Sequence, residues 1–208
     1  MIKEILDNEK KEHVSSGKFS ISGIGGCWRK KYLELRGEYK EDFTEQTLRL
    51  FEIGNITHRL ITRELIEKES SDFHLVASEV DIPTQKYISG RIDDIVSVNG
   101  ENVIIDVKSC SLWTMKAVRN GKVNENYKNQ VLLYQHVTGI HKGFLLFFDK
   151  SKGDMEEVEV IYDEEKAKRL VQEIEDFFHN YVEKDIEPEK CDGGQFGCGA
   201  CKVGGDFK

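Results

Sequence analysis

The stretch GRIDDIVSVNGENVIIDVK, residues 90–108, contains acidic residues and a lysine on what reads as a single β-hairpin. Asn99 and Gly100 form the pair most typical of a two-residue hairpin turn, because both positions tolerate a positive φ. The segments on either side are rich in Ile and Val, as strands are. Side chains alternate between the two faces of a strand, so Asp106 and Lys108 should point the same way. The hairpin therefore predicts a carboxylate and an ammonium group side by side.

These residue types fit the hydrolysis of a phosphodiester. A divalent cation held by carboxylates polarises a phosphoryl oxygen and lowers the pKa of a bound water. A neighbouring lysine can balance the negative charge of the transition state. The first strand supplies Asp93 or Asp94, and alternation allows only one of them to face the site. A D-x-K triplet alone also occurs on ordinary surface strands, so the order of further residues has to decide.

Several motifs follow one another in a fixed order along the chain. They are GNITH from Gly54 to His58 on a helix, Glu79 on a strand, GRID ending at Asp93, DVK from Asp106 to Lys108, and QVLLY from Gln130 to Tyr134 on a second helix. This succession resembles the RecB-like clade of the PD-(D/E)XK nuclease superfamily. The resemblance covers most of the chain, from about residue 27 to residue 201. It implies a metal-dependent deoxyribonuclease.

The resemblance also implies residue roles. The ligands of a catalytic Mg²⁺ or Mn²⁺ would be His58, Glu79, Asp93, Asp106 and the Val107 carbonyl. Lys108 would assist the attacking water, and Gln130 and Tyr134 would support the site or contact DNA. Taken alone, a helical histidine is more often a surface or core residue, a strand glutamate is ordinarily exposed, and helix packing equally explains Tyr134. Gly54 favours the functional reading of His58, because a costly mid-helix glycine one turn before it suits a close approach to the sheet.

Four of the five cysteines lie at the two ends of the chain. Cys27 stands near the beginning, and Cys191, Cys198 and Cys201 lie in a Gly-rich segment that is poor core material. Disulfides are disfavoured by the odd count and by the charged N-terminus, which is no secretory signal. A metal held by these four cysteines is therefore expected, and the fifth, Cys110, is interpreted as a structural or incidental thiol.

Four thiolates suit either Zn²⁺ or an iron–sulfur cluster. The resemblance favours a 4Fe-4S cluster that joins the two chain ends, as in the Cas-four exonucleases of CRISPR systems and the AddB-type repair nucleases. In those families the close C-x-x-C pair usually comes first and the distant cysteine last. Here Cys191 precedes the pair Cys198 and Cys201, so the sequence leaves both metals open.

The composition limits the mode of DNA binding. A net charge of -8 argues against nonspecific coating of DNA, which relies on a positive surface, although a local basic groove remains compatible with it. One candidate groove is WRKKY, residues 28–32, with Arg29 and Lys30 as substrate contacts. A second comprises Lys116, Arg119, Lys122 and Lys128. Basic residues mixed with aromatics suit single-stranded nucleic acid, but a solvated helix face explains each patch equally well.

The pattern of elements predicts the fold class. Helices are expected before residue 15, around Cys27, and over 44–69, 112–119, 126–138 and 163–187, and strands over 73–82, the hairpin, 144–148 and 155–162. They predict an α/β fold with a central mixed β-sheet flanked by helices, a restriction-endonuclease-like core. We expect one nuclease domain over 1–208, with a helical N-terminal segment (1–43), the core (44–186) and a C-terminal cysteine-rich metal loop (187–208). No run is long enough to span a bilayer, so a cytoplasmic protein is expected, in the host cytoplasm if viral.

The sequence thus predicts a metal-dependent DNA nuclease. The resemblance narrows this to a single-stranded DNA exonuclease of Cas-four or RecB type, with CRISPR adaptation proteins or viral or cellular recombination, replication and repair proteins as partners. The alternative is a DNA-end-binding adaptor subunit with little activity alone. The intact Asp93, Asp106 and Lys108 set argues against that alternative, because a pure binder has no need of it. A redox-sensing role for the cysteine metal is a third possibility.

Overall fold

The computed structural model describes residues 16–192 and 198–202, so the helix expected before residue 15 and the middle of the cysteine loop lie outside it. The described part is built on a five-stranded sheet of order β2-β4-β5-β6-β7. Its strands are β2 (Phe73–Asp81), β4 (Arg91–Val98), β5 (Glu101–Cys110), β6 (Lys142–Asp149) and β7 (Met155–Glu159). The β5–β6 pair is parallel and the other pairs are antiparallel. The predicted α/β class with a mixed sheet is confirmed.

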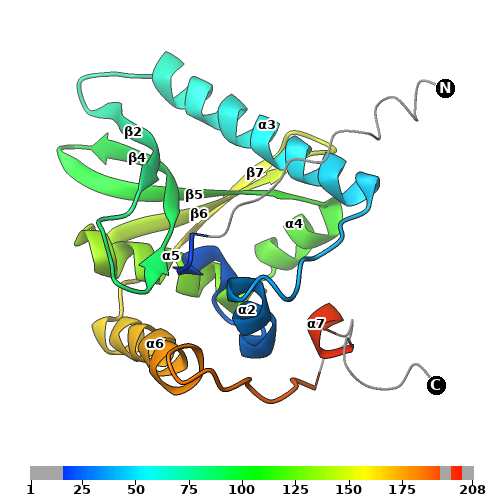
Figure 1. The fold of residues 1–208 in the computed structure, drawn as a ribbon. Helices are drawn as coiled ribbons and strands as arrows, with labels where there is room; N and C mark the ends of the chain where they lie inside the picture. Colours follow the sequence, from blue (N-terminus) through cyan, green and yellow to red (C-terminus); the bar gives the residue numbers. More distant parts are fainter. Residues whose placement is uncertain (1–15, 193–197, 203–208) are drawn as a thin grey trace.

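Helices cover both sides of this sheet (Figure 1). Helix α3 (Glu45–Glu67) packs on β2 and β5 from one side. On the other side lie α5 (Glu125–Thr138), α6 (Glu164–Phe177) and α2 (Trp28–Leu35). Parallel strands need a long crossover, and α4 (Leu112–Arg119) with α5 supplies it between β5 and β6.

Local sequence signals explain where the helices begin. The Thr44 side chain accepts a hydrogen bond from the Thr47 N–H ahead of α3, and Ser111 does the same for α4. Asp163 accepts from the Lys166 N–H at the start of α6, as its sequence position predicts. Such caps satisfy backbone donors that have no partner inside the helix. The helix boundaries therefore follow closely those expected from the sequence.

The hairpin at Asn99 and Gly100 is confirmed, with φ of 53° and 83° at the two positions. The β4–β5 ladder runs from the turn as far as the pair Asp94 and Ile105. Beyond that pair, the Val107 N–H donates to Asp93 Oδ2 at 2.8 Å. The Asp93 carboxylate thus accepts a backbone N–H of β5 just beyond the last pair of the ladder, and this hydrogen bond fixes the position of the carboxylate.

Several short elements carry too few residues to show a period in the sequence. Strands β1 (Phe19–Ser20) and β3 (Ile88–Ser89) form a small parallel pair. A π-helical turn, Phe178–Val182, extends α6 and ends before the expected stop at Pro188. The last is α7 (Gly199–Lys202), a single turn next to α2 (Figure 1). Within the described residues, no helix is both long enough and apolar enough to cross a membrane.

Candidate functional site

Asp106 and Lys108 share one side of β5, as alternation predicts. Lys108 Nζ lies 2.6 Å from Asp106 Oδ2 and donates a hydrogen bond to Gln130 Oε1 at 3.0 Å. The Tyr127 ring of α5 lies 5.0 Å from the same ammonium group, at a distance that favours a cation–π contact. Asp106 is only 1% exposed. The lysine is therefore held on three sides next to a buried carboxylate.

Asp93 joins this pair, and Asp94 has different partners. Asp93 Oδ1 lies 3.3 Å from His58 Nδ1 on α3, while its Oδ2 accepts the Val107 N–H. Asp94 instead accepts from Thr62 Oγ1, at 3.0 and 3.2 Å to its two oxygens. Of the two neighbouring aspartates, Asp93 is thus the one placed with His58.

Three ionisable groups here have raised pKa values. Burial raises the pKa of Asp106 to about 6, with the Asp93 carboxylate adding to the shift and Lys108 opposing it. Burial by itself would lower the pKa of His58, but the hydrogen bond and the charge of Asp93 outweigh it and raise that pKa. Burial also raises the pKa of Asp94. Each shift favours the protonated form, and for Asp106 and Asp94 the main cause is burial, which disfavours a charged carboxylate.

Gln130 and Tyr134 form a hydrogen-bonded chain behind Lys108. Gln130 Nε2 donates to Tyr134 Oη at 3.3 Å, and that hydroxyl donates to the Arg91 carbonyl of β4 at 2.8 Å. Both side chains are buried. A Cβ added at Gly90 would lie 2.9 Å from Tyr134 Cε1, so the glycine lets the tyrosine approach β4. Of the two expected roles, the buried positions favour support of Lys108 over contact with DNA.

Among the described residues, no contact joins Glu79 to this group, so its role as a further acidic ligand stays a prediction. Its exposed carboxylate lies 3.9 Å from Arg91 Nη1. The residue has a φ of 50°, which interrupts the extended conformation of β2.

The first expected basic groove, WRKKY at residues 28–32, is not open for DNA in the structure. Arg29 is 8% exposed; its guanidinium donates to the Ala200 carbonyl and pairs with Glu187. Lys30 pairs with Glu41, and Trp28 stacks on Phe177 with ring centroids 4.9 Å apart. The segment is α2, whose side chains join the core and the C-terminal segment, so Arg29 has no free face for a phosphate.

The second basic patch is partly neutralised by acidic neighbours. Arg119 lies 3.2 Å from Glu156 and 3.6 Å from Asp154, and Lys128 lies 3.6 Å from Glu125. Trp113 is 79% exposed, with Lys116 Nζ 5.2 Å from its ring. This end of α4 therefore retains one aromatic and basic pair on the surface.

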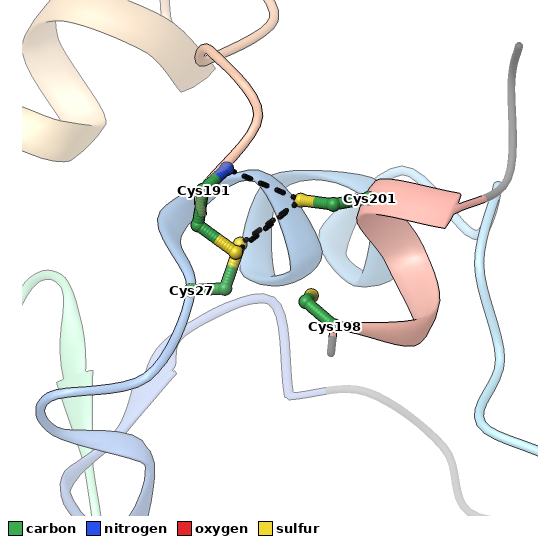
Figure 2. A group of neighbouring side chains, drawn as sticks. All are labelled: Cys27, Cys191, Cys198 and Cys201. Atoms are coloured by element: carbon green, nitrogen blue, oxygen red, sulfur yellow. Dashed lines mark hydrogen bonds between the residues drawn. The ribbon is translucent and has the colours of Figure 1, made fainter. Parts of the chain in front are cut away.

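The four terminal cysteines come together, as predicted. The Sγ atoms of Cys27, Cys191, Cys198 and Cys201 all lie within 4.8 Å of one another (Figure 2). Among the described residues, no other group of three or more potential metal ligands meets so closely. Cys110 is buried at the end of β5 and is not part of this group. The cysteine group joins α2 to the C-terminal segment.

Backbone donors point at the sulfurs. The Lys30 N–H donates to Cys27 Sγ and the Cys191 N–H to Cys201 Sγ, both at 3.4 Å. Burial opposes ionisation of Cys201, but the Cys191 N–H and the neighbouring thiols lower its pKa to about 7. A thiol that ionises near neutral pH is prepared to bind a metal.

Residues 27–204 match the family model described as the PD-(D/E)XK nuclease superfamily. The chain belongs to the PD-(D/E)XK nuclease superfamily. A search of curated proteins gave no match.

Three solved structures are similar to this superfamily member. LHK-Exo, an alkaline exonuclease from Laribacter hongkongensis crystallised with dAMP, has a TM-score of 0.61 and 19% identity, over 82% of this chain and 90% of that one. SSO0001 has a TM-score of 0.53 and 22% identity, over 87% of each chain. A phage-related exonuclease from Haemophilus somnus 129PT has a TM-score of 0.50 and 15% identity, over 76% and 82%.

A divalent cation, which this superfamily implies, fits the residues present. Asp106 Oδ2 is buried and, apart from its close ionic contact with Lys108, has no hydrogen-bond partner among the described residues. Carboxylate oxygens suit Mg²⁺ or Mn²⁺. Sequence reasoning missed Tyr127 and Thr62, which contact Lys108 and Asp94, because neither belongs to a recognisable motif.

Proposed function

We propose that this protein is a Mg²⁺- or Mn²⁺-dependent deoxyribonuclease that degrades DNA from an end. The observation that carries the proposal is the convergence of Asp93, Asp106, Lys108 and His58 from two strands and a helix. Support for action at ends comes from LHK-Exo, an exonuclease described with bound dAMP. A deoxynucleoside monophosphate is the class of product that cleavage at a DNA end releases.

The metal would be held by Asp93, Asp106 and His58, with the Val107 carbonyl as a further ligand. When bound, the cation supplies Lewis-acid activation of the phosphoryl group and of a water. Asp93 is oriented for this by the Val107 N–H. Lys108 is positioned by Asp106 and Gln130, so its ammonium group can donate to the attacking water and balance charge on the phosphate. Gln130 and Tyr134 limit the conformations of Lys108.

We infer single-stranded DNA as the preferred substrate. The protein carries a net charge of -8, and basic residues of both candidate patches are engaged by carboxylates, among them Lys30, Arg119 and Lys128. Long duplexes bind through an extended positive surface, whereas a single-stranded end needs a short one together with aromatic contacts. CRISPR adaptation or a viral or cellular recombination, replication or repair system is the proposed setting, on the resemblance described above.

The test is degradation of labelled linear single-stranded DNA with Mn²⁺ or Mg²⁺, beside a circular single strand and a linear duplex of the same sequence. Lys108→Met keeps the length of the side chain and removes its charge; Lys168→Met makes the same change on the exposed surface of α6. We expect release of mononucleotides from the linear strand and a loss of about 100-fold or more in Lys108→Met, with a much smaller change in Lys168→Met. Asp106→Ala should be inactive.

Two results would overturn parts of this proposal. Cleavage of the circular strand at the same rate as the linear one would make the protein an endonuclease. Binding of DNA ends without cleavage under any divalent metal would leave the adaptor function in its place.

A further inference from the structure

The spacing of the four cysteine sulfurs limits what they can hold. All four Sγ atoms lie within 4.8 Å of one another. Cys201 Sγ lies 3.6 Å from Cys27 Sγ and 3.5 Å from Cys191 Sγ. If all six sulfur–sulfur distances were 4.8 Å, the centre of the tetrahedron would lie about 2.9 Å from each sulfur. This upper limit is only slightly longer than a zinc–sulfur bond of about 2.3 Å. The space between the sulfurs is thus the size of one ion.

The two candidate metals require different spacings. Tetrahedral Zn²⁺ with bonds of about 2.3 Å places its sulfurs about 3.8 Å apart. In a 4Fe-4S cluster each cysteine binds a different iron at the outside of the cluster, which separates the sulfurs by roughly 6 Å. The distances of 3.5 and 3.6 Å are close to the first value. We propose that the four cysteines hold a single tetrahedral Zn²⁺ ion, in place of the iron–sulfur cluster that the resemblance to Cas-four nucleases implies.

The packing around the cysteines fixes this spacing. Helix α7, which follows Cys198 and contains Cys201, is docked on α2 by the Arg29 guanidinium at the Ala200 carbonyl. Ala200 is completely buried, and a Cβ on Gly199 would overlap Tyr39 Oη. Cys27 in turn is the N-cap of α2, held by the Lys30 N–H. Widening the group to the size of a cluster would require these packed elements to separate.

The local chemistry agrees with a structural zinc site. Cys198 and Cys201 have the C-x₂-C spacing of zinc ligands, on a turn in which the Cys201 N–H donates to the Cys198 carbonyl at 3.0 Å. The N–H groups of Lys30 and Cys191 donate to two of the sulfurs, as neighbours of metal ligands do. Four thiolates and Zn²⁺ carry a net charge of -2, which the Arg29 guanidinium beside Cys201 partly balances. Zn²⁺ has no redox chemistry, so the proposal also removes the redox-sensing role.

The test is the metal content of the full chain, purified anaerobically without a metal-affinity tag from cultures given both iron and zinc. We expect one zinc per chain by mass spectrometry of the metals, no acid-labile sulfide, and no broad visible absorption. Replacing zinc with Co²⁺ should give the intense visible bands of tetrahedral cobalt thiolate. Cys198→Ser should reduce the zinc content at least tenfold, while the matched variant Cys110→Ser should keep it.

Two results would overturn the zinc assignment. The first is a content of four irons and four sulfides per chain, in the isolated protein or after incubation with iron and sulfide. The second is a chain that binds neither metal. Because the readout is metal content, inactivity of the nuclease site would not affect this test.

Discussion

Replacing Asp106 with Asn should stabilise the protein at pH 7.5 when divalent metal is absent. The carboxyl of Asp106 is almost completely buried, and its pKa rises from 3.8 to about 6 on folding. A shift of about two pKa units corresponds to roughly 3 kcal/mol of unfavourable free energy for the ionised form. Asn has nearly the same shape and carries no charge. The expected gain is therefore about 1 to 3 kcal/mol; the shift already includes the attraction of Lys108, and the lower value allows for an amide that fits the site less well than a neutral carboxyl.

The sign of the pH dependence follows from proton linkage. A carboxyl with a higher pKa in the folded state binds its proton more tightly there than in the unfolded chain. Its contribution to stability is complete below the unfolded pKa of 3.8 and is lost as the pH rises through about 6. The advantage of Asp106→Asn should thus be large at pH 7.5 and small at pH 4.5, where the folded wild type is protonated.

The assay is urea unfolding in EDTA at these two pH values, followed by circular dichroism. Asp176→Asn on α6 is a matched control, because that aspartate is exposed and its hydrogen bond with Gln172 can be kept by an amide. Adding Mn²⁺ should reverse the order, since wild type binds the ion and the variant loses a ligand. If Asp106→Asn is less stable than wild type in EDTA at pH 7.5, the attraction of Lys108 outweighs burial and the reasoning is wrong.

Three further predictions concern neighbouring residues. Gly54→Ala should raise the free energy of unfolding by about 1 kcal/mol through helix propensity, since the nearest atom to the added Cβ is Ser109 Oγ at 3.7 Å; a destabilised variant in thermal unfolding would contradict this. Gly90→Ala should destabilise by about 1 to 3 kcal/mol, because its Cβ would lie 2.9 Å from the buried Tyr134 ring, and unchanged unfolding would refute the close approach. Mn²⁺ affinity measured by calorimetry should fall as His58, whose pKa is raised, becomes protonated; His58→Asn should flatten that dependence between pH 6 and 8, and an equally steep dependence would exclude His58 as a ligand.

The sequence predicts the sheet and its hairpin because the signals there are local. The turn at Asn99 and Gly100 needs only its own backbone conformation, and the alternation of β5 places Asp106 beside Lys108. Caps such as Thr44 and Asp163 mark helix starts within three residues. Such features depend on neighbouring residues and not on the rest of the fold.

Errors arose where tertiary contacts decide the outcome. WRKKY has the composition of a nucleic-acid groove, but Trp28 stacks on Phe177 and Arg29 binds the C-terminal turn, both distant in sequence. Glu79 has a positive φ that no residue type announces. Gly54 suggested an approach to the sheet that only glycine allows, yet an added Cβ would lie 3.7 Å from Ser109 Oγ, an ordinary van der Waals contact. Composition indicates what a side chain can do, and packing determines whether it is available.

A metal bound by the cysteine group would also give the chain the topology of a closed ring. Cys27 and Cys201 stand 174 positions apart, and His58, Asp106 and Tyr134 all lie on the segment between them. In the chain-entropy model, closing a loop of this length lowers the conformational entropy of the unfolded chain and so stabilises the folded state by roughly 5 kcal/mol. A single proteolytic cut in the turn after β6, at residues 150–154, would open the ring without separating its two pieces, because the metal would still hold them together.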